Sequence, residues 1–306
     1  MTRTFHQVPS DGVPPSTRRP RAIAAAASVL VLAVARYAAY RGLRPSGPPA
    51  QPPPGCQVGT GAQAISMDTG QAAVAATIAA VAARHRLPRQ AVTIAYAAAL
   101  QETKMQNLDY GDRDSVGVFQ QRPSQGWGTT SQLEDPVYAA TKFFAALVRV
   151  PGYAKMPVDQ AAQDVQHSAD GTAYGQWAPL AAALAGYFTG APPHGVSCWY
   201  APPGHADLAA VTRQLTQTFG PQGQAGVVIR ITTDRSDKTE NGSVTVVHAQ
   251  RDAAWTVASW LVAYAQNYGI SEVRYAGYEW NAADGSAGWQ HAGSPQGQVR
   301  GSIVAG

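Results

Sequence analysis

The chain contains only two cysteines, and their positions limit how its central part can fold. Cys56 and Cys198 lie on either side of the most helix-prone stretch of the sequence. An even number of cysteines is typical of a disulfide formed in an oxidising compartment. Such a bond would close a loop of more than a hundred residues and would contribute about 5 kcal/mol in the chain-entropy model. The sequence alone leaves two unpaired thiols as the alternative.

Positive charge is concentrated at the N-terminus. Residues 1–44 hold seven arginines against one acid, a charge of +6, and the whole chain carries +4, so 4 − 6 = −2 remains for the rest. The part of the chain beyond residue 44 is therefore mildly acidic. It lacks the basic surface that nucleic-acid binding requires, so we expect no nucleic-acid partner.

The N-terminal arginines precede an apolar run. Residues 22–35 carry no charge, but this length of helix rises only about 21 Å, less than the roughly 30 Å hydrocarbon core. An extension to residue 43 completes a span if Arg36 and Arg41 reach the interface. We therefore expect residues 22–43 to form a transmembrane anchor, or alternatively a signal segment cleaved near Ala35. Residues 1–21 would be a cytoplasmic tail, and the chain would be a single-pass membrane protein or, after cleavage, a secreted one.

Proline-rich stretches divide the remainder of the chain. Residues 44–55 predict a stiff, extended linker. Further Pro-Pro pairs at residues 192–193 and 202–203 favour a boundary near residue 198. We expect a mainly helical domain over residues 56–198 and a small α+β domain over residues 199–306, so that the fold class is α+β.

Apolar residues recur with helical spacing in the central region. The pattern predicts helices at residues 71–85, 89–105, 135–148, 158–168 and 179–187. Residues 107–128 are rich in Gly, Asp and Pro, which indicates a structured loop or a small hairpin.

The periodicity changes after residue 199. Strands are predicted at residues 226–232, 243–249 and 272–277, and a helix at residues 252–268. Asn241-Gly242 predicts a tight turn between the first two strands. Trp260, Tyr264 and Tyr268 repeat every four residues, which is typical of core. Trp280 and Trp289 are alternative candidates for stacking on sugar rings.

The candidate catalytic residue is Glu102, in the last turn of an otherwise apolar predicted helix. Glutamate is scarce here, because Glu134 is the only other one between the cysteines. The helix dipole and apolar surroundings both disfavour the charged carboxylate, which suits a general acid. The alternative is an ordinary glutamate at a helix end, paired with Lys104 or Arg113.

Two motifs around Glu102 resemble a known family. The segments Gln101-Glu102-Thr103 and Ser115-Val116-Gly117-Val118-Phe119-Gln120 are similar to the motifs of the transglycosylase (SLT) branch of the lysozyme-like superfamily. The runs at residues 111–115 and 120–128 resemble an actinobacterial, membrane-anchored variety, and the resemblance covers about residues 65–190. It implies a lysozyme-like fold and cleavage of the β-1,4 bond between the amino sugars of peptidoglycan.

The resemblance also implies roles for individual residues. Glu102 would be the catalytic acid/base, and the domains would face the cell wall. The implied substrate-binding residues are Gln101, Thr103, Ser115, Gly117, Gln120, Gln166 and Tyr174. Gln166, Ser168 and Tyr174 are the candidates to replace a Tyr-Asn pair that this sequence lacks, and Thr103 stands where serine is usual.

Other functions stay open at the level of sequence. Asp109, Asp112 and Asp114 crowd the loop, and Asp112 or Asp114 would supply the second carboxylate of a lysozyme-type hydrolase. A non-catalytic wall-binding or secretion-scaffold protein is a further alternative. The expected partners are peptidoglycan strands, the membrane and, through residues 199–306, a membrane protein. No cofactor is expected, and no metal, because His167, His194 and His248 lack ligand spacing.

Overall fold

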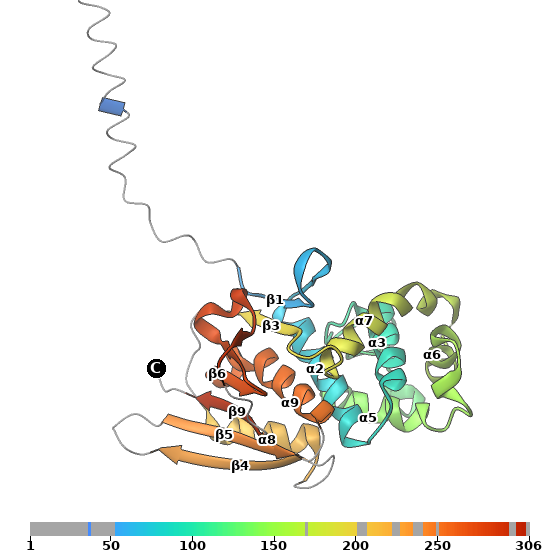
Figure 1. Cartoon of the computed structure of the whole chain (residues 1–306). Coiled ribbons are helices and arrows are strands. Elements are labelled where there is room, and N and C mark those ends of the chain that lie inside the picture. Colours follow the sequence, from blue (N-terminus) through green and yellow to red (C-terminus); the bar gives the residue numbers. More distant parts are fainter. Residues whose placement is uncertain are drawn as a thin grey trace, which may run out of the picture. The chain divides into compact units, whose positions relative to one another are not determined.

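A computed structural model describes residues 36–37, 53–168, 171–200, 207–221, 227–234, 241–248, 251–293 and 298–303. Residues 52–306 form one compact unit, and its combination of helices and antiparallel sheets is the expected α+β class (Figure 1). The predicted anchor, residues 22–43, lies outside the described residues except for Arg36 and Tyr37. Within the described ranges, no helix has both the length and the apolar character needed to span a bilayer.

Helices make up most of the chain up to residue 188. They are α2 (Thr69–Arg84), α3 (Arg89–Thr103), α4 (Thr130–Leu133), α5 (Pro136–Leu147), α6 (Val158–Gln166) and α7 (Ala178–Phe188). Short 3-10 turns lie at η1 (Gly61–Gln63), η2 (Pro123–Gln125), η3 (Tyr153–Lys155) and η4 (Gly171–Trp177). The five predicted helices are confirmed as α2, α3, α5, α6 and α7. Local signals explain where they begin: Asp68 and Gln71 form a capping box on α2, and Asp135 caps α5 ahead of Pro136.

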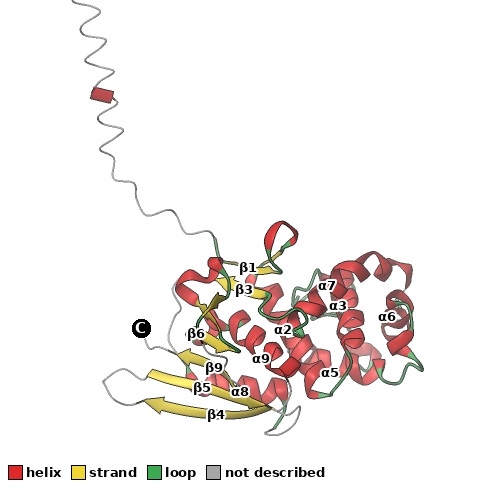
Figure 2. Ribbon diagram, in the orientation of Figure 1, coloured by secondary structure: helices red, strands yellow, loops and turns green. Residues whose placement is uncertain are grey.

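Helix α3 lies at the centre of the helical part. Every residue from Ala91 to Leu100 is buried, because α2, α5, α6, α7 and η4 pack around it (Figure 2). Many of these residues are alanines, which allow neighbouring backbones to approach closely. The helix ends where Lys104 and Met105 both adopt left-handed backbone conformations, with φ of 56° and 63°.

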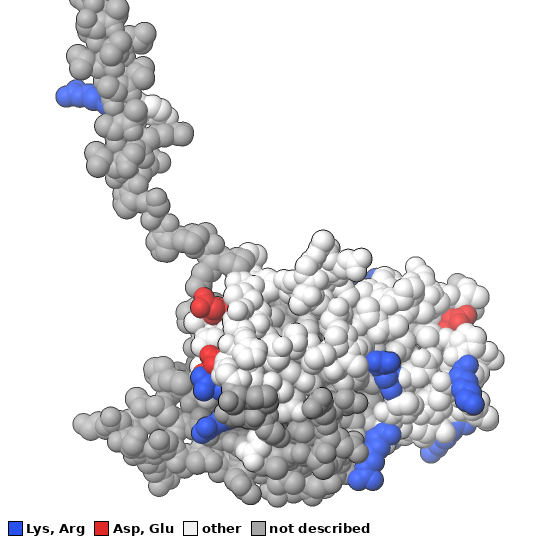
Figure 3. Space-filling model, in the orientation of Figure 1, with Lys and Arg blue, Asp and Glu red and all other residues white. Residues whose placement is uncertain are grey.

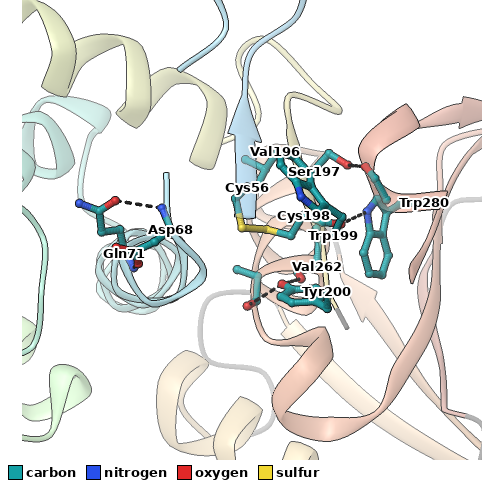
Figure 4. The surroundings of a disulfide bond; sticks show 12 residues. Cys56, Asp68, Gln71, Val196, Ser197, Cys198, Trp199, Tyr200, Val262 and Trp280 are labelled. Atoms are coloured by element: carbon teal, nitrogen blue, oxygen red, sulfur yellow. Dashed lines mark hydrogen bonds between the residues drawn. A yellow bond between two sulfur atoms is a disulfide. The ribbon is translucent and has the colours of Figure 1, made fainter. Parts of the chain in front are cut away.

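A small antiparallel sheet holds the disulfide. Its order is β2 (Ile65–Met67), β1 (Gly55–Val58), β3 (Val196–Trp199). Cys56 and Cys198 lie directly opposite each other on β1 and β3 and form the predicted disulfide (Figure 4). Both sulfur-bearing residues are buried. The bond therefore joins the two ends of the helical part inside the core.

A second antiparallel sheet follows. Its order is β4 (Val227–Asp234), β5 (Asn241–His248), β9 (Gln298–Ile303), β6 (Ile270–Tyr275), β7 (Tyr278–Asn281), β8 (Gln290–His291). Helices α8 (Leu208–Phe219), α9 (Arg251–Ala263) and α10 (Ala265–Tyr268) accompany it, with a 3-10 turn η6 (Ala282–Ala287). The strands predicted at residues 226–232, 243–249 and 272–277 correspond to β4, β5 and β6. The single helix predicted at residues 252–268 is interrupted at Tyr264, between α9 and α10.

The tight turn predicted at Asn241-Gly242 is wrong. Asn241 pairs with Asp234 and Gly242 with Thr233, so both residues belong to strand β5. Gly242 also pairs with Ile303 of β9 on its other side. Pairing along both edges of β5 outweighs the local turn preference.

One hydrophobic core runs across the division expected at residue 198. Helix α9 packs against α2, and the hydroxyl of Thr77 on α2 is hydrogen-bonded at 2.8 Å to that of Tyr264, the residue that follows α9. Tyr200 donates to the carbonyl of Val262 at 2.6 Å (Figure 4). The expected core residue Trp260 is fully buried and stacks on Tyr264, with ring centroids 4.4 Å apart. A large side chain buried in this way contributes about 1.5–3 kcal/mol, so the two parts stabilise each other.

Replacement of both cysteines by serine tests the role of the disulfide. We expect the Cys56→Ser/Cys198→Ser variant to keep its far-UV circular dichroism and to lose about 2–5 kcal/mol, because its unfolded chain gains the entropy of an open loop. Thermal denaturation should show a midpoint at least about 5 °C lower. An unchanged midpoint, or free thiols in the non-reduced wild-type protein, would contradict this account.

Candidate active site

Glu102 is the only carboxylate on helix α3, and it lies in the last turn. Residues Ala91 to Leu100 of the helix are buried, whereas Glu102 is half-buried. A charge is costly to bury without a partner, so α3 can carry charges only outside this buried stretch, and Glu102 lies just beyond its C-terminal end. The two left-handed residues that follow turn the chain away sharply and leave this end of the helix partly open.

The 3-10 turn η4 brings two aromatic side chains to the end of α3. A 3-10 helix has three residues per turn, so Tyr174 and Trp177 lie on the same side of η4. The hydroxyl of Tyr174 donates to Glu102 Oε1 at 2.7 Å. The indole N–H of Trp177 donates to Gln101 Oε1 at 2.8 Å. Two consecutive residues of α3 thus bind two residues of η4 that are one turn apart.

Tyr174 is fully buried beside Glu102. Burial raises the pKa of its hydroxyl well above the ordinary value, and the hydrogen bond to Glu102 raises that pKa further. Tyr174 therefore stays a proton donor throughout the neutral range. The Tyr174 hydroxyl also has a hydrogen bond with the side chain of Ser168, which donates to Gln163 Oε1 at 2.7 Å.

The loop between α3 and α4 is hydrogen-bonded to α3 and to α6. The Thr103 hydroxyl lies 2.9 Å from the carbonyl oxygen of Val118 and 3.1 Å from that of Ala99, and donates to them. From α6, Gln166 Nε2 donates to the carbonyl of Phe119 at 2.8 Å. The loop predicted at residues 107–128 is thus confirmed as a structured loop, and its residues 118–119 are held between α3 and α6.

Inside this loop, the motif residues bind one another. Gln120 Oε1 accepts from the Ser115 hydroxyl at 3.0 Å, and Gln120 Nε2 donates to the carbonyl of Tyr110 at 3.2 Å. Gly117 has φ +77°, and a Cβ there would collide with the carbonyl of Leu133. Only glycine fits this backbone conformation without strain. Ser115, Gly117 and Gln120 therefore shape the loop.

The structure brings some of the sequence-predicted residues into direct contact and leaves others in supporting positions. Glu102 and Tyr174 touch. Gln101, Thr103 and Gln166 bind other parts of the protein through their polar atoms. Ser168, a candidate to replace the Tyr-Asn pair, donates to Gln163, whereas Trp177 was not predicted from the sequence as part of the site. The spacing of three between Tyr174 and Trp177 was the available signal, but it indicates a shared face only once a 3-10 turn is known.

The three loop aspartates differ in their surroundings. The backbone N–H of Ser124 and the guanidinium of Arg122 hold the pKa of Asp114 well below its usual range. Arg122 Nε lies 2.7 Å from its carboxylate. Asp109 and Asp112 are exposed, and Asp112 has only a 3.8 Å contact with Arg113. Asp114 is therefore a weak base with its oxygens occupied.

The two tryptophans considered for sugar stacking have different positions. Trp280 is fully buried, and its indole N–H donates to the carbonyl of Cys198 at 3.2 Å (Figure 4). The alternative of sugar stacking at Trp280 is therefore wrong, because no face of the ring is accessible. Trp289 is half-buried and lines a pocket of about 230 Å³ together with His194 and Trp199.

A larger groove lies between the ends of α5 and α6. It has a volume of about 640 Å³ and is lined by residues of η2 and its following loop, the end of α5 and the end of α6, among them Trp127, Arg149 and Gln166. Glu102 itself is not one of the lining residues. Within the described part of the chain, no cluster of His, Cys, Asp and Glu has the composition of a metal site.

Thr103 offers a test of how the loop is fastened. We expect Thr103→Val, which keeps the side-chain shape, to lower the free energy of unfolding by about 1–2 kcal/mol, because the carbonyl of Val118 loses the hydroxyl that donates to it. Thr103→Ser, the matched control, keeps the hydroxyl and should stay close to the wild type. Chemical denaturation measures both, and equal stability of all three proteins would show that the hydrogen bond is dispensable.

Comparison with protein-family models and with curated proteins found no match. The arrangement around Glu102 and the motifs of the sequence are therefore the basis on which a function can be proposed.

Proposed function

We propose that this protein is a lytic transglycosylase that cleaves the β-1,4 bond between the amino sugars of peptidoglycan, with Glu102 as the general acid and base. The observation that carries the proposal is the hydrogen bond from the buried Tyr174 hydroxyl to Glu102 Oε1, at 2.7 Å. It joins Glu102, in the motif at residues 101–103, to Tyr174, one of the residues considered as a replacement for the family's Tyr-Asn pair. The SLT-type motifs around residues 101–103 and 115–120 supply the substrate class.

The hydrogen bond gives the two oxygens of Glu102 different roles. Oε1 accepts from Tyr174, whereas Oε2 accepts no hydrogen bond within the described residues. A proton on a neutral Glu102 would therefore reside on Oε2, the oxygen free to meet a substrate. The hydrogen bond from Tyr174 also restricts the rotation of the Glu102 carboxyl group. General acid catalysis requires a proton donor that is held in position.

The proposed reaction then proceeds in two steps. Glu102 donates its proton to the glycosidic oxygen, the bond from that oxygen to the anomeric carbon breaks, and positive charge develops on the sugar ring. The carboxylate next accepts the proton of the sugar's own primary hydroxyl as the hydroxyl oxygen bonds to the anomeric carbon. The products are a free 4-hydroxyl end and an anhydro-sugar end, and no water is consumed.

The surroundings of the aspartates favour this mechanism over the hydrolase alternative. A lysozyme-type hydrolase needs a second carboxylate near the first. Asp114 binds Arg122 and Ser124, and Asp112 is exposed to solvent. Attack by the substrate's own hydroxyl requires only one carboxylate, and Glu102 is the one that has a buried partner.

Most of the described surface in Figure 3 carries neither basic nor acidic side chains.

Glu102→Gln is the primary test. It keeps the shape of the side chain and removes the proton donor, so the release of soluble fragments from purified peptidoglycan should fall by about 10²–10⁴-fold. Glu134→Gln, at the only other glutamate between the cysteines, is the matched control and should retain wild-type activity. Undiminished activity of the Glu102→Gln variant would refute the proposed mechanism.

Tyr174→Phe tests the partner of Glu102. The ring remains and only the hydroxyl is lost, so we expect an unchanged circular dichroism spectrum and a rate reduced by about 10- to 100-fold, the value of one hydrogen bond to a charged group. Tyr153→Phe, at a half-buried tyrosine elsewhere in the helical part, serves as the control. A Tyr174→Phe protein with full activity would exclude a role for this hydrogen bond.

A further inference from the structure

The pocket that Trp289 lines is separate from the candidate active site. Three segments far apart in the chain form it, at residues 57–61, 194–199 and 285–289. It shares no lining residue with the groove between the ends of α5 and α6, and neither Glu102 nor Tyr174 lines it. Its volume of about 230 Å³ is below the roughly 300 Å³ at which pockets for drug-sized ligands begin. The pocket therefore fits a ligand of one ring.

The walls of this pocket are held in place by the small sheet that contains the disulfide and by η6. Figure 4 shows Ser197 on β3, next to Cys198 of the disulfide. The Ser197 hydroxyl donates to the carbonyl of Gly285 at 2.6 Å. A Cβ at Gly285 would collide with the carbonyl oxygen of Cys198, so η6 packs directly on the backbone of β3. A pocket built in this way is formed before a ligand binds, which lowers the cost of binding.

Two tryptophans give the pocket an apolar wall. The indole N–H of Trp199 donates to the carbonyl of Pro53, and that of Trp289 donates to the carbonyl of Val196, each at 2.7 Å. The ring of Trp289 also packs against Trp255, with ring centroids 5.3 Å apart. Both lining tryptophans are half-buried. Because their nitrogens are already hydrogen-bonded, they offer ring carbons to a ligand.

Three polar side chains line the same pocket. They belong to Gln57, Thr60 and Ser286, and none of them has a side-chain hydrogen bond within the described part of the chain. Thr60 precedes the turn η1, but its hydroxyl does not cap that turn. One amide and two hydroxyls are therefore available, and they can both donate and accept hydrogen bonds.

The pocket offers no charge to a ligand. Among the described residues that line it there is no Asp, Glu, Lys or Arg. His194 lines it and stacks on Tyr278, with ring centroids 4.3 Å apart. Burial lowers the pKa of His194, so its ring is neutral at neutral pH. A charged ligand would lose its hydration here without gaining a partner of opposite charge, and the expected ligand is uncharged.

We propose that this pocket binds one uncharged sugar ring, with a C–H face of the ring against Trp199 and Trp289. The sugar hydroxyls would form hydrogen bonds with Gln57, Thr60 and Ser286. A pyranose combines an apolar face with hydroxyls around its edge, which matches an aromatic wall beside amide and hydroxyl groups. The inference goes beyond the proposed function and does not depend on it, because no residue of the candidate active site lines the pocket.

Fluorine NMR of the whole chain labelled with 5-fluorotryptophan tests this proposal. The chain has seven tryptophans, and Trp199→Phe and Trp289→Phe each remove one resonance and so assign it. N-acetylglucosamine, an uncharged sugar, should shift both resonances to saturation with one dissociation constant of about 1–10 mM, since a single ring buries little surface. The resonance of the fully buried Trp260 should not move. Glucosamine carries an ammonium group instead of the acetamide and should bind at least about fivefold more weakly.

Thr60→Ala and Ser286→Ala test the polar contacts. Each removes one exposed hydroxyl and should weaken binding of N-acetylglucosamine by about fivefold, the value of one neutral hydrogen bond. Ser66→Ala, at an exposed serine of β2 that does not line the pocket, is the matched control and should bind as the wild type does. Equal affinity in all four proteins would overturn the proposed contacts.

The pattern of shifts separates this inference from the alternatives. Unchanged resonances of Trp199 and Trp289 up to about 100 mM sugar would overturn it, and so would shifts that benzyl alcohol produces and the sugar does not. A shift confined to Trp177, which binds Gln101, would place the sugar at the candidate active site instead. Saturable shifts of Trp199 and Trp289 in a protein that releases no fragments from peptidoglycan would retain this site and refute only the enzyme.

Discussion

Burial of helix α3 on every side is the constraint on which the rest of the structure depends. A helix with no exposed face between Ala91 and Leu100 needs neighbours all around it, and α2, α5, α6, α7 and η4 provide them. It cannot carry a charge along this length without a large desolvation cost. Glu102 therefore occupies the last turn, where the helix meets the segments that reach it from elsewhere in the chain.

Those segments reach the end of α3 from distant parts of the sequence and are held there by few interactions. Thr103 fastens the motif loop through Val118, Gln101 fastens η4 through Trp177, and Tyr174 binds Glu102 itself. Each of these hydrogen bonds involves the side chain of one of three consecutive residues of α3. Under the proposed function, a site held in this way would be ordered before a substrate arrives, which would reduce the reorganisation that catalysis requires.

Sequence patterns predicted the helices well because apolar periodicity, caps and proline placement are local. Asp135 and Pro136 mark the start of α5 within a residue of the prediction, and the cysteine pair correctly predicted the disulfide. Non-local interactions caused the errors. Pairing with β4 and β9 places Asn241 and Gly242 within a strand, and Trp280 is covered by chain segments that its own sequence neighbourhood does not reveal. The contact between α2 and α9, nearly two hundred residues apart, was equally beyond local signals, and so was the 3-10 turn that aligns Tyr174 with Trp177.

The most direct test of the account is the mass of the fragments that the wild-type protein releases from peptidoglycan in water enriched in heavy oxygen. A single carboxylate that recruits the substrate's own hydroxyl predicts fragments with anhydro ends, each lighter by one water than a reducing end and free of heavy oxygen. Fragments with reducing ends that contain solvent oxygen would contradict this account and assign a hydrolase. Binding to the wall without any released fragment would show that the arrangement around Glu102 is not catalytic.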